Sequence, residues 1–355
     1  MAETVFWSSL IFVLYAYCGY PLVLLLWKWW APRPVQKAPL EPDVTLVLAA
    51  FNERDNIRQK ILNCLSLDYP REKLQIIVSL DGPTDGTEVV ALTFASQGVQ
   101  LSYAPKHVGK AAAINSAVAR AQGSVLVFVD ARQVLNRNVI RELAANFSDG
   151  SVGAVSGELV LARGGTGESG GVGLYWRYET LIRTLESQIH SVVGATGALY
   201  AIRRRFFREL PPDTLLDDVV VPMSVVLNGG RVVLDRSARA FDQPVEPEKE
   251  FGRKVRTLAG NFQLLARMPQ LLSPWRNPVF FQFVSHKVTR LFVPYLLVAL
   301  LVANLFLLRG GYLVFLGLQI LWYSLAVAGY VAAFGWRSGP ASAADRDERM
   351  RMQAR

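Results

Sequence analysis

The sequence predicts an α/β domain built on a mainly parallel, doubly wound sheet and attached to three membrane helices. Between about residues 40 and 245, short apolar stretches alternate with amphipathic ones, which is the pattern of strands joined by helical crossovers. Long apolar runs occupy residues 5–30, 291–308 and 312–335. Each run can cross a hydrocarbon core of roughly 30 Å as a helix of about 20 residues.

The strands and helices of the middle region follow one another at short intervals. In chain order, we expect strands at 43–50, 74–80, 99–105 and 124–130, and helices after the first strand, from Glu88 and over 109–122. The first of these helices should bury the face formed by Ile57, Ile61, Leu62 and Leu65, because these residues recur at helical spacing.

Acids stand where ligands of such a sheet bind, beyond the carboxyl ends of the strands. Glu53, Asp81 and Asp130 each follow or end a predicted strand. Because two neighbouring acids repel, Asp81 and Asp130 should share a cation or a hydrogen-bonding ligand. The alternative is a helix cap or a turn, and we favour it for Asp85, which stands in Asp-Gly-Thr at a helix start.

The composition points to a membrane protein. The chain has 355 residues, a hydrophobic fraction of 51% and a formal net charge of +9. The positive charge lies mainly between the first and second apolar runs and in the tail, whereas the loop between the last two runs carries only Arg309. The positive-inside bias therefore predicts a multi-pass protein of the inner (plasma) membrane, with the middle region and the C-terminus in the cytoplasm.

The charge distribution and the termini exclude other classes of protein. Since the basic residues border the apolar runs, we expect attraction to membrane lipids and to a phosphate-bearing substrate, and no nucleic acid partner. The start, MAETVFW, lacks the basic region of a cleavable signal peptide, so the first run is expected to stay as a membrane helix. Cys18 and Cys64 have no metal-ligand spacing and are expected to pack.

Seven motifs follow one another along the chain: AAFNE (49–53), SLDGPTDGT (79–87), GKAAAINSA (109–117), FVDA (128–131), GATGALYAIRR (194–204), LLDDVVVPMSVVLNGGRV (215–232) and RKVRTLAGNFQLL (253–265). Their succession resembles that of the membrane-bound glycosyltransferases of family 2, which include the polysaccharide synthases of the cellulose and hyaluronan type. The resemblance covers roughly residues 40–290. It implies a GT-A fold, a nucleotide-sugar donor, a divalent cation and inversion at the anomeric carbon.

The resemblance also divides the chain. Together with the apolar runs and the charge bias, it predicts an N-terminal transmembrane helix (1–30), a GT-A domain (31–245), interfacial helices (246–290), two transmembrane helices (291–336) and a cytoplasmic tail (337–355). Within the interfacial part, His286 is expected to be a polar interface residue and not a metal ligand, because none of the three histidines has ligand spacing to another.

For the donor, the family match places Glu53 and Asp81 on the base or ribose, and Lys110 on the diphosphate, although a solvated lysine at a helix start is an equal alternative. Asp130 matches the first acid of the D-x-D motif, which coordinates Mg²⁺ or Mn²⁺. Arg132 stands at the second acid. Two possibilities follow: Asp130 holds the cation with phosphates and water, or Arg132 takes over part of its charge.

For the reaction, the family match makes Asp218 the general base and Asp217 its neighbour, with helix capping as the alternative. Gly197 matches a glycine that lets the backbone approach a sugar.

Arg253 and Arg256 match the family's Q-x-x-R-W segment, where Arg256 could clamp the diphosphate. Thr257 replaces its tryptophan, which argues against a standard processive synthase.

The expected function is transfer of one sugar, from a UDP-sugar by family precedent, to a lipid-linked polyprenyl acceptor in envelope or exopolysaccharide synthesis. Two alternatives stay open. One is a processive synthase that extends a growing glycan as a homo-oligomer. The other is a non-catalytic scaffold in a polysaccharide-assembly complex, motivated by Arg132 and Thr257.

Overall fold

The computed structural model describes residues 1–161, 170–242 and 247–334. The chain divides into two compact units. The larger contains Ala16–Pro244 and Arg256–Leu291, and the smaller contains Met1–Tyr15, Val245–Val255 and Phe292–Arg355. The predicted tail, 337–355, lies outside the described residues.

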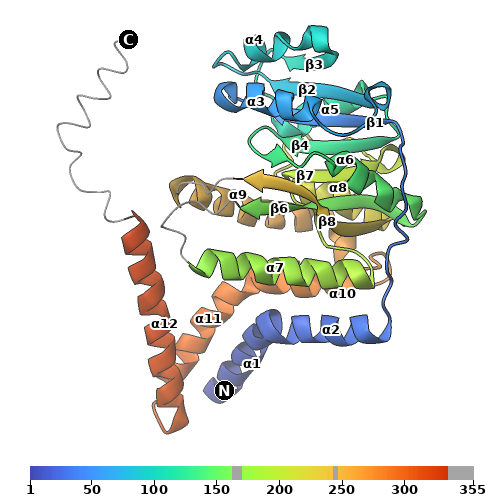
Figure 1. The fold of residues 1–355 in the computed structure, drawn as a ribbon. Coiled ribbons are helices and arrows are strands. Elements are labelled where there is room, and N and C mark those ends of the chain that lie inside the picture. The colour runs from blue at the N-terminus through green and yellow to red at the C-terminus, as the bar shows by residue number, and fades with distance from the viewer. Residues whose placement is uncertain (162–169, 243–246, 335–355) are drawn as a thin grey trace, which may run out of the picture. The chain divides into compact units, whose positions relative to one another are not determined.

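An eight-stranded mixed sheet forms the centre of the larger unit (Figure 1). Its strands are β1 Val44–Ala50, β2 Leu74–Asp81, β3 Val99–Ala104, β4 Val125–Asp130, β5 Val134–Leu135, β6 Val152–Leu161, β7 Leu199–Arg203 and β8 Arg231–Asp242, in the order β3-β2-β1-β4-β7-β6-β8-β5. The four predicted strands β1 to β4 are present and mutually parallel. β7 lies antiparallel between β4 and β6.

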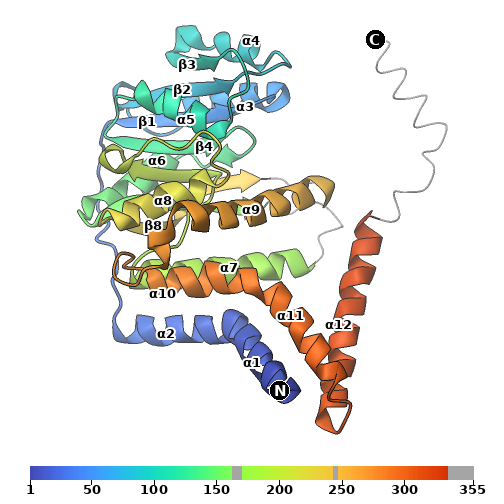
Figure 2. The same ribbon diagram turned by 180° about the vertical axis from the view of Figure 1, so that it is seen from behind.

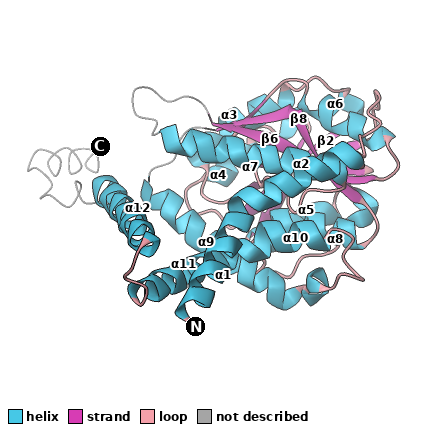
Figure 3. Ribbon diagram, turned by 90° about the horizontal axis from the view of Figure 1, so that it is seen from below, coloured by secondary structure: helices cyan, strands magenta, loops and turns pink. Residues whose placement is uncertain are grey.

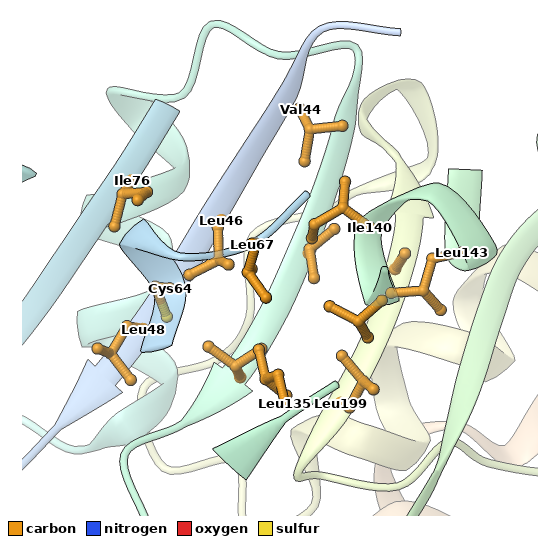
Figure 4. Close-up of a cluster of buried hydrophobic side chains, with 14 of the residues drawn as sticks. Val44, Leu46, Leu48, Cys64, Leu67, Ile76, Leu135, Ile140, Leu143 and Leu199 are labelled. Atoms are coloured by element: carbon orange, nitrogen blue, oxygen red, sulfur yellow. The ribbon is translucent and has the colours of Figure 1, made fainter. Parts of the chain in front are cut away.

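Both faces of the sheet are covered by helices. These are α3 Arg54–Leu65, α4 Thr87–Leu92, α5 Lys110–Ala119, α6 Val139–Ala145, α7 Gly170–Ile189, α8 Asp217–Leu227 and α9 Pro247–Arg267. Strand β1 shows how the two layers form, since successive side chains point to opposite faces. Leu46 and Leu48 pack with α3 and α6 in one core cluster (Figure 4). Val47 packs with α5 and α8 in the other, on the face seen in Figure 2.

This double burial explains why the strands appear as continuous apolar runs rather than alternating ones. Helix α3 buries Ile57 and Ile61 as expected. Leu62 is an exception, because it is 49% exposed.

The strand register brings the predicted ligand edge together. Ala49 of β1 pairs with Asp130, and Ala50 pairs with Leu80, the residue before Asp81. The segments that follow β1, β2 and β4 therefore leave the sheet at the same edge.

Three helical runs are long and apolar enough to cross a membrane: Ala2–Trp30, Phe280–Leu305 and Gly311–Val331. The first comprises α1 Ala2–Leu14, the π-helical turn Tyr15–Gly19 and α2 Tyr20–Trp30. The second comprises α10 Phe280–Phe283, the π-helical turn Val284–Val288 and α11 Thr289–Leu305, and the third lies in α12 Gly311–Phe334. Residues 280–290, which we expected in an interfacial helix, are thus continuous with the second run.

Each unit contains part of these runs. In the smaller unit, Phe6 is buried against Leu300, Ala303 and Leu307. In the larger unit, α2 packs along α7 (Figure 3).

Candidate active site

Asp81, at the end of β2, organises the loop before α5. Its Oδ1 accepts hydrogen bonds from Val108 N at 2.7 Å and Gly109 N at 3.2 Å, and its Oδ2 lies 2.9 Å from His107 Nδ1. The loop passes close over Gly82, where a Cβ would lie 2.2 Å from the Lys106 carbonyl carbon. The expected nucleoside residue is therefore buried and already holds a loop.

His107 is a site residue that the sequence did not reveal. Its ring lies against that of Phe51, with centroids 4.1 Å apart. Both rings are exposed at the edge where β1 ends. The two rings come into contact only through the fold, because no local sequence pattern links residues so far apart.

Glu53 begins α3, and its Oε2 accepts a hydrogen bond from Asn56 Nδ2 at 2.7 Å. Asp85 accepts hydrogen bonds from Arg54 N at 3.0 Å and Thr87 N at 2.9 Å. The turn role favoured for Asp85 thus agrees with its contacts.

Lys110 links the strand edge to α8. It is the first residue of α5, and its Nζ lies 3.0 Å from Asp130 Oδ1 and 3.4 Å from Asp217 Oδ1. Burial opposes its charge, but the carboxylates of Asp130, Asp217 and Asp218 outweigh burial and raise the pKa of Lys110. This lysine at the start of α5 is therefore a partly exposed cation that pairs with two acids.

The paired acids at the start of α8 have different surroundings. Asp217 is buried, and besides Lys110 it accepts a hydrogen bond from Tyr200 OH at 3.3 Å. The Asp218 carboxylate shows no hydrogen bond or ion pair within the described part of the chain, and it is only partly buried. Burial, reinforced by the charge of Asp217, raises the pKa of Asp218 to about 6.

Gly197 lies directly against Asp218. A Cβ at this glycine would be 3.2 Å from Asp218 Oδ2. The neighbouring Ala195 N donates to the Asp218 carbonyl oxygen at 2.7 Å. The segment before β7 thus covers the start of α8 closely, as a glycine at this position allows.

Arg132 does not face Asp130 in an ion pair. Its guanidinium pairs with Asp242 at the end of β8, and Gln133 Nε2 donates to the same carboxylate oxygen at 2.9 Å. The buried Nε of Arg132 has no hydrogen-bond partner among the described residues. The guanidinium thus compensates an acid of the protein and retains only part of its capacity for a phosphate.

These contacts limit what a divalent cation could find here. Asp217 and Asp242 are both engaged by cations of the protein, and one oxygen of Asp130 is engaged by Lys110. No group of three or more potential ligands occurs among the described residues. Mg²⁺ or Mn²⁺ would fit only through Asp130 together with donor phosphates and water, which Mg²⁺ accepts.

The two arginines of the last motif lie on α9. Arg253 lies 4.0 Å from Glu250 in an ion pair, and Arg256 is exposed without a hydrogen bond or ion pair in the described ranges. The second half of α9 is tied to the segment before Asp217. Gln263 Oε1 accepts from Leu215 N at 3.0 Å, and Leu216 packs on Gly260. The sequence did not identify these contacts, which join segments nearly 50 residues apart.

An arginine-lined surface hollow of about 590 Å³ lies at the opposite end of β4. Its lining includes Arg204, Arg205 and Arg208, beside Val125. Since Val125 and Asp130 are the two ends of a six-residue strand, roughly 17 Å separates the hollow from the acids. It contains no acidic residue and takes no part in the site.

The chain is similar to known proteins in sequence and in fold. The profile of glycosyl transferase family 2 matches residues 45–210. The N-acetylglucosaminyltransferase of Rhizobium leguminosarum bv. trifolii is 31% identical over 137 residues, which are 37% of this chain and 74% of that protein. The poly-beta-1,6-N-acetyl-D-glucosamine synthase of Staphylococcus aureus (strain MSSA476) is 25% identical over 236 residues, 63% of this chain and 56% of that protein.

Coverage of other relatives is lower, and one N-acetylglucosaminyltransferase is matched over only 32% of its length. Among solved structures, the mannosyltransferase PcManGT from Pyrobaculum calidifontis, in complex with GDP-Man and Mn²⁺, superposes with a TM-score of 0.70. It is 21% identical, and the match covers 92% of this chain and 98% of that one. This likeness shows a shared GT-A-like fold. The order of motifs, the family match and the fold agree, and the chain belongs to glycosyltransferase family 2.

Proposed function

We propose that this glycosyltransferase transfers a sugar, with inversion, from a nucleotide sugar to a lipid-linked acceptor in cell-envelope or exopolysaccharide synthesis. The observation that carries the proposal is the state of Asp218. Its carboxylate lacks a partner among the described residues, lies beside the Lys110–Asp130 pair, and has a pKa of about 6. A base with such a pKa is largely ionised at neutral pH yet able to accept a proton.

The donor would lie along the strand edge. Asp81 and Glu53, with the rings of Phe51 and His107, form the end suited to a nucleoside. Lys110 would contact the diphosphate; its ammonium lies near Asp130 and Asp217 at this edge, which supports that role. N-acetylglucosamine appears in the names of both bacterial relatives, so UDP-N-acetylglucosamine is the first donor to test.

A divalent cation would bind at Asp130 and the donor phosphates. Bound there, it would neutralise charge that develops on the leaving nucleoside diphosphate. PcManGT was solved with Mn²⁺, which supports testing Mn²⁺ as well as Mg²⁺.

The chemical step follows from Asp218. Its carboxylate takes the proton of an acceptor hydroxyl while that oxygen attacks the anomeric carbon from the side opposite the nucleotide. The new glycosidic bond forms as the bond from the anomeric carbon to the phosphate oxygen breaks, and the nucleoside diphosphate leaves with the electron pair. Lys110 offsets part of that charge. Asp218 ends protonated and returns its proton to solvent.

The membrane setting supports a lipid-linked acceptor. Three apolar helical runs flank or follow the catalytic segment, and the basic residues favour a cytoplasmic catalytic domain at the inner membrane. The relative that makes poly-N-acetylglucosamine supports the second candidate, a processive synthase acting as an oligomer. Thr257 at the position of the family tryptophan favours single addition.

The test is turnover by the full chain in lipid nanodiscs, with UDP-N-acetylglucosamine and GDP-mannose. Each donor is supplied with Mg²⁺, Mn²⁺ or chelator, with and without a membrane lipid extract, and nucleotide release and product size are measured. Extract-dependent release that Asp218→Asn abolishes supports the proposal. Asp43→Asn is the matched control, since Asp43 precedes β1 at the other end of the sheet.

The other outcomes are distinct. A ladder of product sizes would replace single addition by processive synthesis. Wild-type protein that neither binds nor turns over any donor would be a scaffold and would contradict the proposal.

A further inference from the structure

Helix α7 holds the start of the second apolar run through buried ion pairs. His286 lies between two carboxylates, with Nε2 2.8 Å from Glu179 Oε1 and Nδ1 2.8 Å from Glu186 Oε1. Arg290 Nη1 lies 2.8 Å from Glu179 Oε2. Tyr20 OH donates to Glu186 Oε1 at 2.6 Å. The orientation of residues 284–290 is therefore fixed by α7.

Lys287 lies between these two paired cations and is itself unpaired. Among the described residues, it makes no hydrogen bond and no ion pair, although its side chain is half-buried. It belongs to the π-helical turn Val284–Val288, a geometry often found at functional sites. Its neighbours His286 and Arg290 both pair with Glu179, so the backbone of Lys287 lies beside α7.

Arg183 is a second cation, on the stretch of α7 that holds His286. It lies one turn after Glu179 on α7, and its Nη2 donates to Ser156 Oγ at 2.7 Å. Ser156 Oγ also accepts from Thr196 N at 3.0 Å, next to Gly197, which lies against Asp218. Arg183 shows no ion pair in the described part of the chain, and on α7 it lies between Glu179 and Glu186, the two acids that hold His286.

Two half-buried cations without a paired carboxylate are costly for a protein, because burial removes water and like charges repel. An anionic ligand offsets both effects. Phosphate oxygens suit this pair, since a guanidinium binds two of them through parallel N–H groups and an ammonium adds a point charge.

We propose that Lys287 and Arg183 bind the phosphate group of a membrane lipid acceptor beside Asp218. This inference rests on the proposed function and names its acceptor. For the donor diphosphate, the proposed contact is Lys110 at the strand edge, beside Asp130. Lys287, in contrast, lies on the helical run Phe280–Leu305, which is apolar enough to enter a membrane. A ligand that reaches it most directly is one anchored in lipid.

The test is binding of farnesyl phosphate to the full chain in dodecyl maltoside, measured by calorimetry. Farnesol is the control ligand without a phosphate group, and inorganic phosphate is the control ligand without a lipid chain. We expect farnesyl phosphate to bind at least tenfold more tightly than either. Lys287→Met and Arg183→Gln should each weaken it at least tenfold, whereas Lys287→Arg should stay within threefold of wild type. Lys73→Met, at an exposed lysine that pairs with Glu41, is the matched control.

Several results would overturn the inference. If Lys287→Met binds farnesyl phosphate as tightly as wild type, Lys287 is not part of the site. If inorganic phosphate binds as tightly as farnesyl phosphate, the site does not select a lipid. If Lys287→Met aggregates, the test uses the binding of farnesyl phosphate by Arg183→Gln and Lys287→Arg instead.

Turnover separates the two proposals. Wild-type protein that releases nucleotide with lipid extract but does not bind farnesyl phosphate loses only this inference. Lys287-dependent binding without turnover would leave the phosphate site standing and contradict the proposed transfer.

Discussion

The two sides of the candidate site differ in how their charges are compensated. On the strand edge, Asp81 holds its loop, Asp130 pairs with Lys110, and Arg132 pairs with Asp242. On the side of α7 and α8, neither the Asp218 carboxylate nor the Lys287 ammonium has a hydrogen bond or ion pair in the described ranges. The edge is thus organised before any ligand arrives, whereas the second side keeps charges that a substrate can use.

The largest expected effect comes from removing the free carboxylate. Asp218→Asn should lower transfer about 10³-fold, because a positioned general base contributes roughly 10²–10⁴ in rate. Donor affinity, measured by calorimetry with UDP-N-acetylglucosamine, should change by less than about threefold. The corresponding change in binding free energy is smaller than that of a one-unit pKa shift, about 1.4 kcal/mol. Variant activity within tenfold of wild type would move the base elsewhere.

A substitution on the strand edge, where the charges are paired, should change donor binding. Lys110→Met leaves Asp130 and Asp217 facing each other, and we expect the donor dissociation constant to rise by about 10- to 100-fold, as for loss of a charge-assisted contact of 1.5–3 kcal/mol. Lys110→Arg should recover part of it. The measurement is donor titration with and without Mg²⁺, and unchanged affinity in Lys110→Met would leave this lysine a purely structural role.

The pH dependence of transfer should report Asp218. Its active form is the carboxylate, so with a pKa raised to about 6, kcat/KM should fall about tenfold per pH unit below that value. Above it, the rate should be level until another group titrates. Profiles of wild type and Asp218→Glu are the measurement, and a wild-type rate that stays level down to pH 5 would disagree with this assignment.

The smallest effect is on stability, and its sign distinguishes the two sides. Because the folded state raises the pKa of Asp218, its ionised form opposes folding, and this cost grows as pH rises through about 4 to 6 and persists above. Asp218→Asn should therefore raise the stability of the protein at pH 8 relative to wild type. Asp242→Asn should destabilise it, because Arg132 loses its partner. Thermal unfolding at pH 5 and pH 8 tests both; a gain for Asp218→Asn at pH 5 equal to that at pH 8 would count against the linkage.

The sequence predicted the parallel core and the acids at its edge for a physical reason. Strands β1, β2 and β4 are buried on both faces, so their residues are mainly apolar without alternation, and parallel strands bring Asp81 and Asp130 to one edge. The family motifs pointed to Lys110, Gly197, Asp217 and Asp218 as site residues. The structure brings these residues together at the start of α8, and their roles stay predictions.

What the sequence could not predict depends on distant partners. The antiparallel insertion of β7 requires pairing with β4 and β6, which no local pattern encodes. The charged residues around His286 suggested a helix separate from the second run. Glu179 and Glu186, about 100 residues earlier, compensate those charges, so the helix continues through them.

Gly82 has a consequence for how this protein can evolve. Any side chain there would overlap the backbone at Lys106, and its φ of +58° also disfavours other residues. Replacement would dislodge the loop that Asp81 holds, so substitutions at this codon cannot accumulate neutrally while the gene is under selection. Among related genomes, a retained glycine at this position would mark a copy still under constraint, and its loss would mark one that is free to decay.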